Sequence, residues 1–239
     1  MALSIFVNWL FLSAQFIILF TLMSREEFAQ TERNQVRRIA KRGKYDKDTI
    51  FGILDESFLC HISFCLNEQP FTIPTLFARV DDAIYIHGSH ISRMLKTLAE
   101  GVQLCLTVTL VDGLVLARSA FHHSINYRSA VIFGTGKLVE SEAEKNLALK
   151  AISDNILPER WEDCREPNSK ELKVTTVIKI EIENASAKIR EGMPIDDDSD
   201  LDLPVWAGIL PIKKIFGQPI PDENLSPEIQ IPEYFPNNK

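Results

Sequence analysis

Two stretches of the chain carry side chains that could bind a small anionic ligand. The first covers residues 86–93 and reads IHGSHISR. It predicts a strand, a glycine turn and a helix start, where backbone N–H groups are free to hold an anion. Gly88 would let the backbone approach the ligand closely, while Ser89 and Arg93 would donate hydrogen bonds. The stretch is typical either of a phosphate site or of a capped helix followed by a surface arginine.

The second stretch covers residues 118–129 and lies between two apolar segments. Nine of its twelve side chains are polar or aromatic types that form hydrogen bonds. A solvated surface loop would have this composition. A mixture of His, Tyr and Arg directly after a strand, with no Gly or Pro break, also suits the rim of a flat heteroaromatic ligand. The residues alone leave both interpretations open.

Other patterns argue against several kinds of site. His122 and His123 are adjacent, so they point apart, and no further Cys or His lies at zinc-ligand spacing. Gly134 and Gly136 lead into a strand instead of the helix that a dinucleotide fingerprint requires. The sequence has no serine elbow, phosphate-binding loop or paired-carboxylate motif. Hydride transfer by a flavin needs none of these, because the cofactor carries that chemistry.

Alternating apolar and polar residues predict the sheet that would position both stretches. Short turns between the segments favour hairpins and antiparallel pairing. Amphipathic helices are predicted over residues 91–99 and 141–157. The predicted strands cover residues 58–66, 71–80, 83–87, 102–118, 130–139 and 172–182. Six strands with few helices indicate an all-β-dominated fold, a small closed or partly closed barrel.

Pro74 lies inside the second of these predicted strands. Proline cannot donate to a ladder, so we expect this position at a sheet edge, at a bulge or beside something other than a strand. Asp112 and Gly113 predict a turn or bulge within the long fourth strand.

The two ends differ from the middle of the chain. Residues 1–24 lack Asp, Glu, Lys and Arg, so they suit a membrane anchor or a start site placed too far upstream. Basic residues follow, and either interpretation predicts a cytoplasmic location for the rest. Residues 25–50 are predicted as a polar, helical lead-in ending near Gly43, residues 51–190 as the barrel domain, and residues 191–239 as a proline-rich extended arm on the domain or on a partner subunit.

The composition is that of an ordinary globular protein. The 239 residues include 26 basic and 33 acidic side chains, for a net charge of −7, and 45% are apolar. These values exclude a disordered chain, and the acidic balance argues against a generic nucleic-acid binder. The four cysteines follow no metal-ligand pattern and suggest reduced thiols.

The sequence resembles the pyridoxamine 5′-phosphate oxidase-related flavoproteins, and within them the flavin-nucleotide-binding branch with nitroimidazole-reductase-like proteins. The resemblance runs from about residue 33 to 212. It implies an FMN-binding split β-barrel, antiparallel, with FMN held at the interface of a homodimer. The matching stretches are FTIPTLFARVDDAIYIHGSHISRML (71–95), CLTVTLVDGLVLARSAFHHSINYRSAVIFGTGKLVE (105–140), SAKIREG (186–192) and PVWAGILPI (204–212).

The same resemblance implies roles for individual residues. Those expected to line the isoalloxazine ring through their backbone are Ile73, Pro74, Thr75 and Leu76. Those expected to hold the ribityl phosphate are His87, Gly88, Ser89 and Arg93. Those expected around the ring or the open substrate face are Ser119, His122, His123, Ser124, Tyr127 and Arg128. Trp206 would reach the flavin from the arm, or else it is a packing tryptophan.

Two departures argue against pyridoxamine-phosphate oxidation itself. The oxidase proper has a Lys directly after the phosphate-binding Arg, where this chain has Met94. It also has a carboxyl-terminal pattern of Arg and Trp, where this chain offers only Lys188 and Arg190. The expected function is an FMN-dependent oxidoreductase that acts on a small aromatic or nitro compound through the flavin N5. The alternatives are a non-catalytic flavin carrier or sensor, and a split barrel that binds haem or a deazaflavin.

Overall fold

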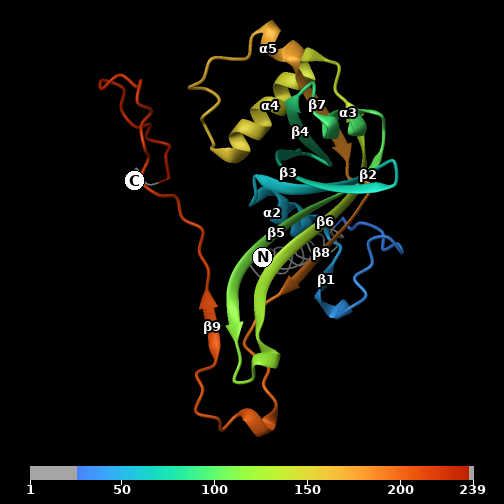
Figure 1. Ribbon diagram of the computed structural model, residues 1–239, viewed down its shortest axis with the longest axis vertical. Coiled ribbons are helices and arrows are strands. Elements are labelled where there is room, and N and C mark those ends of the chain that lie inside the picture. The colour runs from blue at the N-terminus through green and yellow to red at the C-terminus, as the bar shows by residue number, and fades with distance from the viewer. Residues whose placement is uncertain (1–25, 237–239) are drawn as a thin grey trace, which may run out of the picture.

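A computed structural model describes residues 26–236 (Figure 1). Residues 1–24, predicted as an apolar leader, lie outside the described residues. The helices of the described part are η1 (Ala40–Arg42), α2 (Lys47–Asp55), α3 (Arg93–Ala99), η2 (Ala120–His122), α4 (Glu142–Ile156), α5 (Ser169–Val174) and η3 (Asp198–Asp200). The strands are β1 (Gly43–Lys44), β2 (Leu59–Leu66), β3 (Gln69–Val80), β4 (Ala83–Ser89), β5 (Gln103–Leu116), β6 (Ser124–Leu138), β7 (Thr175–Glu181), β8 (Asn184–Arg190) and β9 (Gly208–Pro211).

The strands form one antiparallel sheet that closes on itself. Its order is β1-β8-β6-β7-β4-β3-β2-β5-β9, and an additional β5–β6 pairing joins the two arms of this order into a barrel. The prediction of a small antiparallel barrel with few helices is therefore confirmed. Closure of this kind removes most free strand edges.

The barrel interior is filled by the inward side of the alternating strands. Fully buried side chains from different strands, such as Ile62, Phe77 and Ile132, belong to one core cluster. Buried residues of α2 and α3 belong to the same cluster, so both helices cover the barrel. Helix α4 packs on a second, smaller cluster and is fastened by Asn155, whose side chain donates to the carbonyl oxygens of Ser57 and Phe77 at 3.0 and 2.8 Å.

Strands β5 and β6 are longer than the barrel needs. They pair from Gln103 and Thr135 at one end to Val115 and Ser124 at the other, with a register shift between Val111 and Gly113 that confirms the predicted bulge. Figure 1 shows this hairpin projecting away from the barrel, with β9 running along one edge. The C-terminal arm follows β9 along an extended path, as predicted.

Several predicted elements differ from the structure. Residues 26–46 contain no α-helix, and the helical lead-in is replaced by turns and the short η1. The predicted last strand, residues 172–182, begins only at Thr175, because the Asn168–Glu171 capping box starts helix α5. Strand β8 was not predicted. Part of the polar stretch 118–129 is the first half of β6, not an irregular segment.

Candidate functional site

Within residues 26–236, the outer edge of β3 has no pairing strand at the position of Pro74. Residues 69–76 of β3 pair with β2, whereas β4 pairs only with residues 77–80. Phe77 donates its N–H to Phe58 on the β2 side. Because backbone directions alternate along a strand, the N–H and C=O groups of Thr72 and Leu76 point to the unpaired edge, together with the C=O of Pro74. The prediction that Pro74 lies at an edge is confirmed.

Arg93 opens helix α3 and is exposed beside this strand. Its guanidinium carbon lies 4.2 Å from the centroid of the Phe71 ring, and Phe71 stacks on Phe64. Within residues 26–236 no carboxylate lies within ion-pair distance of Arg93. Its positive charge is therefore available to an anionic ligand. Ser92 caps the helix by accepting from Leu95 N–H at 3.5 Å.

His87 and Gly88 form the floor of the same region. The Nδ1 atom of His87 is buried and has no hydrogen-bond partner within the described residues. Burial lowers the pKa of His87 below its ordinary value, so the ring is neutral at pH 7. A Cβ on Gly88 would lie 3.0 Å from Leu95 Cδ1, so a side chain at this position would require Leu95 to shift. Ser89 is exposed, and its hydroxyl accepts from Ile91 N–H at 3.4 Å.

The structure brings the first group of predicted site residues together. Ile73–Leu76 lie on β3, His87–Ser89 lie on β4, and Arg93 follows directly on α3. The result is a free strand edge, an unpaired cation and an unsatisfied buried imidazole nitrogen in one region. Such a combination suits a ligand that has both a flat polar ring edge and a phosphate.

The second group lies at the other end of the long hairpin (Figure 1). Ser119 caps η2, and His122 Nε2 lies 3.3 Å from Asp197 of the arm. His123 and Ser124 are exposed. Trp206 is 67% exposed and precedes β9, whose Gly208 pairs with Leu116 near the hairpin tip. Within one chain these residues are not brought to Arg93.

Arg128 is held by carboxylates instead of facing open space. Its guanidinium forms ion pairs with Glu56 and with Asp112, the latter at 2.7 Å. These partners raise the pKa of Arg128, and Arg128 in turn lowers the pKa of Glu56. Tyr127 lies beside Arg190 in the β6–β8 register. Arg128 therefore ties β6 both to β5 and to the end of α2.

The contact between Arg118 and Asp196 at this end was not predicted from the sequence. Arg118 donates from its backbone N–H and from Nη1 to Asp196, at 2.7 and 3.0 Å. The Asp196 side chain is only 2% exposed. The acidic run 196–198 was visible in the sequence, but its partner lies 78 positions away. The contact of Phe71 with Arg93 was also not predicted, because the alternating pattern of its segment identifies Phe71 only as a strand residue.

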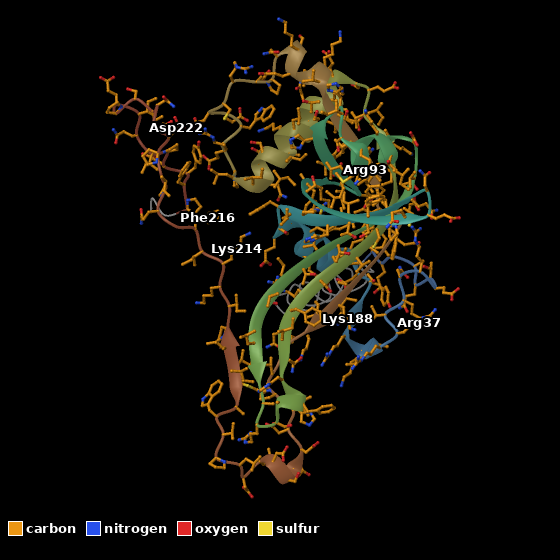
Figure 2. All side chains as sticks on the ribbon, in the orientation of Figure 1. Arg37, Arg93, Lys188, Lys214, Phe216 and Asp222 are labelled. Atoms are coloured by element: carbon orange, nitrogen blue, oxygen red, sulfur yellow. The ribbon has the colours of Figure 1, made fainter. Side chains whose placement is uncertain are left out.

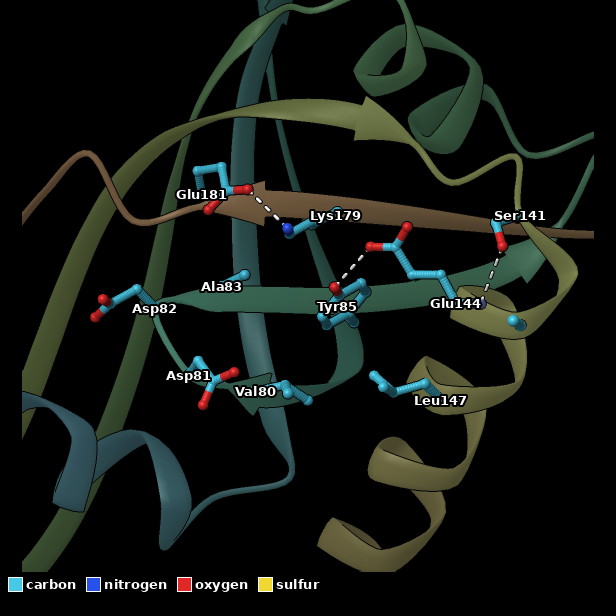
Figure 3. A pocket seen from close by; sticks show the side chains of 11 residues that line it. Val80, Asp81, Asp82, Ala83, Tyr85, Ser141, Glu144, Leu147, Lys179 and Glu181 are labelled. Atoms are coloured by element: carbon cyan, nitrogen blue, oxygen red, sulfur yellow. Dashed lines mark hydrogen bonds and ion pairs between the residues drawn. The ribbon is translucent and has the colours of Figure 1, made fainter.

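A separate hollow of about 590 Å³ lies between the β3–β4 turn and α4. Figure 3 shows that two of its carboxylates are already engaged. Glu144 accepts from the Tyr85 hydroxyl at 2.8 Å, and Glu181 pairs with Lys179 at 2.8 Å. Contacts within the fold therefore account for these side chains of the hollow.

Within the described part of the chain, no cluster of three or more His, Cys, Asp or Glu side chains could hold a metal ion. No helix of this part is long and apolar enough to cross a membrane.

Comparison with protein families matches residues 46–189 to the model described as pyridoxamine 5′-phosphate oxidase. The chain belongs to this family. Among solved structures it is similar to the flavocytochrome Anf3 from Azotobacter vinelandii, with 39% identity and a TM-score of 0.79 over 85% of this chain and 95% of that one. It is also similar to the FAD- and haem-binding protein from Mycobacterium smegmatis, with 33% identity and a TM-score of 0.77 over 81% and 95% of the two chains.

A more distant structure shares the fold. A putative 5-nitroimidazole antibiotic resistance protein from Bacteroides thetaiotaomicron matches with 22% identity and a TM-score of 0.52, over 62% of this chain and 86% of that one. A comparison with curated proteins found no match. The resemblance to split-barrel proteins of the pyridoxamine 5′-phosphate oxidase family, stated from the motifs, is thus confirmed.

Proposed function

We propose that the chain binds a flavin nucleotide and serves as an oxidoreductase. The observation that carries this proposal is the free edge of β3 beside the unpaired Arg93. Support also comes from the flavocytochrome and the FAD- and haem-binding protein, which are 39% and 33% identical to this chain. A bound flavin would supply hydride or electron transfer at its N5 atom.

The residues at the β3 edge fit a flavin ring. Its pyrimidine part carries both N–H and C=O groups, and the strand edge offers both complements. The N–H groups of Thr72 and Leu76 would donate, while the carbonyl of Pro74 would accept. Arg93 would bind the phosphate, and the unpartnered Nδ1 of His87 would face the cofactor. A neutral imidazole can donate or accept there, according to its tautomer.

The identity of the flavin is a separate question, and FMN is the nucleotide that the motifs imply. One of the two more similar structures is described as binding FAD. We therefore propose FMN or FAD, to be distinguished by releasing the chromophore from the full-length purified protein and chromatographing it. A colourless protein that stays colourless after incubation with both nucleotides would overturn the flavin proposal.

The oxidoreductase role is tested by turnover. Reduced nicotinamide nucleotide should bleach the bound flavin anaerobically, and a nitroaromatic compound should restore its colour. A flavin that is reduced chemically but reacts with no acceptor in a broad panel would favour a carrier or sensor. Solvent access to N5 distinguishes the two, because a reductase needs an open substrate face.

Haem is a second candidate cofactor, because one of the two more similar structures is described as a flavocytochrome and the other as a protein that binds FAD and haem. The exposed His123 at the hairpin tip is surrounded in sequence by exposed apolar side chains, including Phe121 at 89%. Histidine is a common axial ligand, and apolar groups suit a porphyrin. A Soret band in the purified protein that is lost in His123→Ala and kept in His90→Ala would support this role. Absence of the band after haem loading would exclude it.

We also propose a homodimer. Large apolar side chains are exposed along the hairpin and the arm, including Trp206 at 67% and Leu210 at 54%. Exposed apolar surface of this extent commonly marks a protein interface. In a dimer, the hairpin tip of one chain could reach the β3 edge of the other and unite the two groups of site residues. Light scattering of the purified protein tests this, and a monomer at micromolar concentration would refute it.

A further inference from the structure

A groove lined by cationic side chains lies on the outer face of β6 and β8, in addition to the site at Arg93. It has a volume of about 300 Å³ and is lined by residues 33–38 together with side chains of both strands. Its lining includes Arg33, Arg37, Arg38 and Lys188 and contains no acidic residue. The whole chain has a net charge of −7, so this concentration of positive charge runs against the overall composition. Figure 2 labels Arg37 and Lys188 near each other, below the β2–β3 hairpin.

The segment that carries these arginines is fixed to the barrel. Asn34 is 3% exposed, and its amide donates to the carbonyl oxygens of Ala29 and Ala185 at 3.0 and 2.9 Å. Val36 N–H donates to the Tyr45 hydroxyl at 2.9 Å. The backbone that presents the cations is thus ordered before any ligand arrives, which reduces the entropy lost on binding.

Two of the four cations of the groove lack an acidic partner among the described residues, whereas Arg33 pairs with Glu183 at 3.7 Å. Within residues 26–236, no carboxylate lies within ion-pair distance of Arg38 or Lys188. Arg37 pairs with Glu32 at 3.1 Å, but both side chains are mostly exposed and such pairs are weak. Ser186, which is 6% exposed, also lines the groove and carries a hydroxyl. A hydroxyl donor and several cations around a small hollow are the groups that bind phosphate.

An aromatic hollow adjoins the cationic one. It has a volume of about 520 Å³, and the two share Arg33 and Phe133 in their linings. Arg33 lies 4.5 Å from the centroid of the Phe133 ring. Phe64 and Phe71, the ring that Arg93 contacts, also line the aromatic hollow. The pair of hollows therefore offers an apolar surface for a flat ring next to a cationic site for an anion.

We propose that these joined hollows bind a phosphate-bearing nucleotide through Arg37, Arg38 and Lys188, apart from the flavin phosphate proposed at Arg93. The nucleotide would be either the adenylate part of a dinucleotide flavin or a separate dinucleotide electron donor. Both sources present the same chemistry, a purine ring and a phosphate. The small volume and the acidic net charge do not suit a nucleic acid.

ADP is the probe, titrated calorimetrically into the full-length protein at low salt, with and without bound flavin. Removing two phosphate contacts in Arg37→Gln/Lys188→Gln should weaken ADP binding by roughly tenfold for each cation. The control is Lys170→Gln, an exposed lysine on α5 outside this groove, which should bind as the unmodified protein does. Unchanged melting temperatures would show that the variants are folded. No ADP binding, or equal binding by the double variant, would overturn the proposal.

Two further titrations identify the source of the nucleotide. If the groove holds the adenylate of the flavin, FAD should bind more tightly than FMN, the double variant should remove that difference, and ADP should compete with FAD only. If it holds a separate donor, ADP and NADPH should bind equally to protein loaded with either flavin. The ADP titration of flavin-free protein does not depend on the proposed function. If the protein bound ADP in the groove but bound no flavin, only the proposed flavin-binding function would be refuted.

Discussion

Replacement of Arg93 by alanine tests the proposed flavin site most directly. The Arg93 side chain is exposed, and its contact with Phe71 is a cation–π pair at 4.2 Å. Such a pair at an exposed site stabilises a fold by roughly 0.5–1 kcal/mol, so the variant should remain folded. If Arg93 binds the flavin phosphate, its loss removes a charge-assisted hydrogen bond of about 2 kcal/mol. This corresponds to a roughly thirtyfold rise in Kd.

The assay is a titration of flavin fluorescence against apoprotein, with a thermal melt of each variant in the absence of flavin. Arg93→Lys keeps the charge but not the planar fork, and its affinity should fall between those of the unmodified protein and Arg93→Ala. Lys96→Ala removes an exposed cation from the same helix and should leave binding unchanged. Equal affinities for Arg93→Ala and Lys96→Ala would remove Arg93 from the site. A loss of affinity matched by a large fall in melting temperature would show a structural role instead.

Three further predictions concern stability and reactivity. A Cβ on Gly136 would lie 2.6 Å from the carbonyl oxygen of Leu98, so Gly136→Ala should destabilise the protein by about 1–3 kcal/mol in urea unfolding. In contrast, a Cβ on Gly52 in α2 would meet no atom within 4 Å, so Gly52→Ala should stabilise the protein by about 0.5–1 kcal/mol. Arg128 lowers the pKa of Glu56 below its ordinary 4.5, so the ion pair stabilises the fold above that pH and this contribution is lost on acidification. The variant Glu56→Gln should therefore show a smaller fall of melting temperature below pH 4.5. An unchanged dependence of melting temperature on pH would contradict this. Burial raises the pKa of Cys60 to about 12, so iodoacetamide at pH 8 should label the exposed Cys65 and Cys164 and spare Cys60, as peptide mass mapping would show.

The barrel was predictable because one side of each strand faces a core. The alternation over residues 58–66 and 102–110 could be recognised since every second side chain is apolar and buried. Strand β8 has the same pattern with small and polar residues, because Ala185 and Ala187 face the core while Ser186 and Lys188 face outward. Alanine differs too little from serine in apolar character for the period of two to stand out in this segment.

The site was predictable in part. Ile73–Leu76, His87–Ser89 and Arg93 are close in sequence, and local elements bring them together. The partners of Arg128 could not be predicted, because Asp112 meets it through the β5–β6 register and Glu56, at the end of α2, lies 72 positions away. The assignments of flavin contacts, the cytoplasmic location and the nature of residues 1–24 stay predictions.

The free edge of β3 also affects the protein before any ligand binds. An open strand edge can pair with a strand of another molecule and begin aggregation. Pro70 and Pro74 share the outward-facing register of this edge, so neither position offers an N–H to an incoming strand. A continuous intermolecular ladder cannot form there. The same prolines that shape a recognition surface therefore protect the newly made, empty polypeptide from fibrillar association.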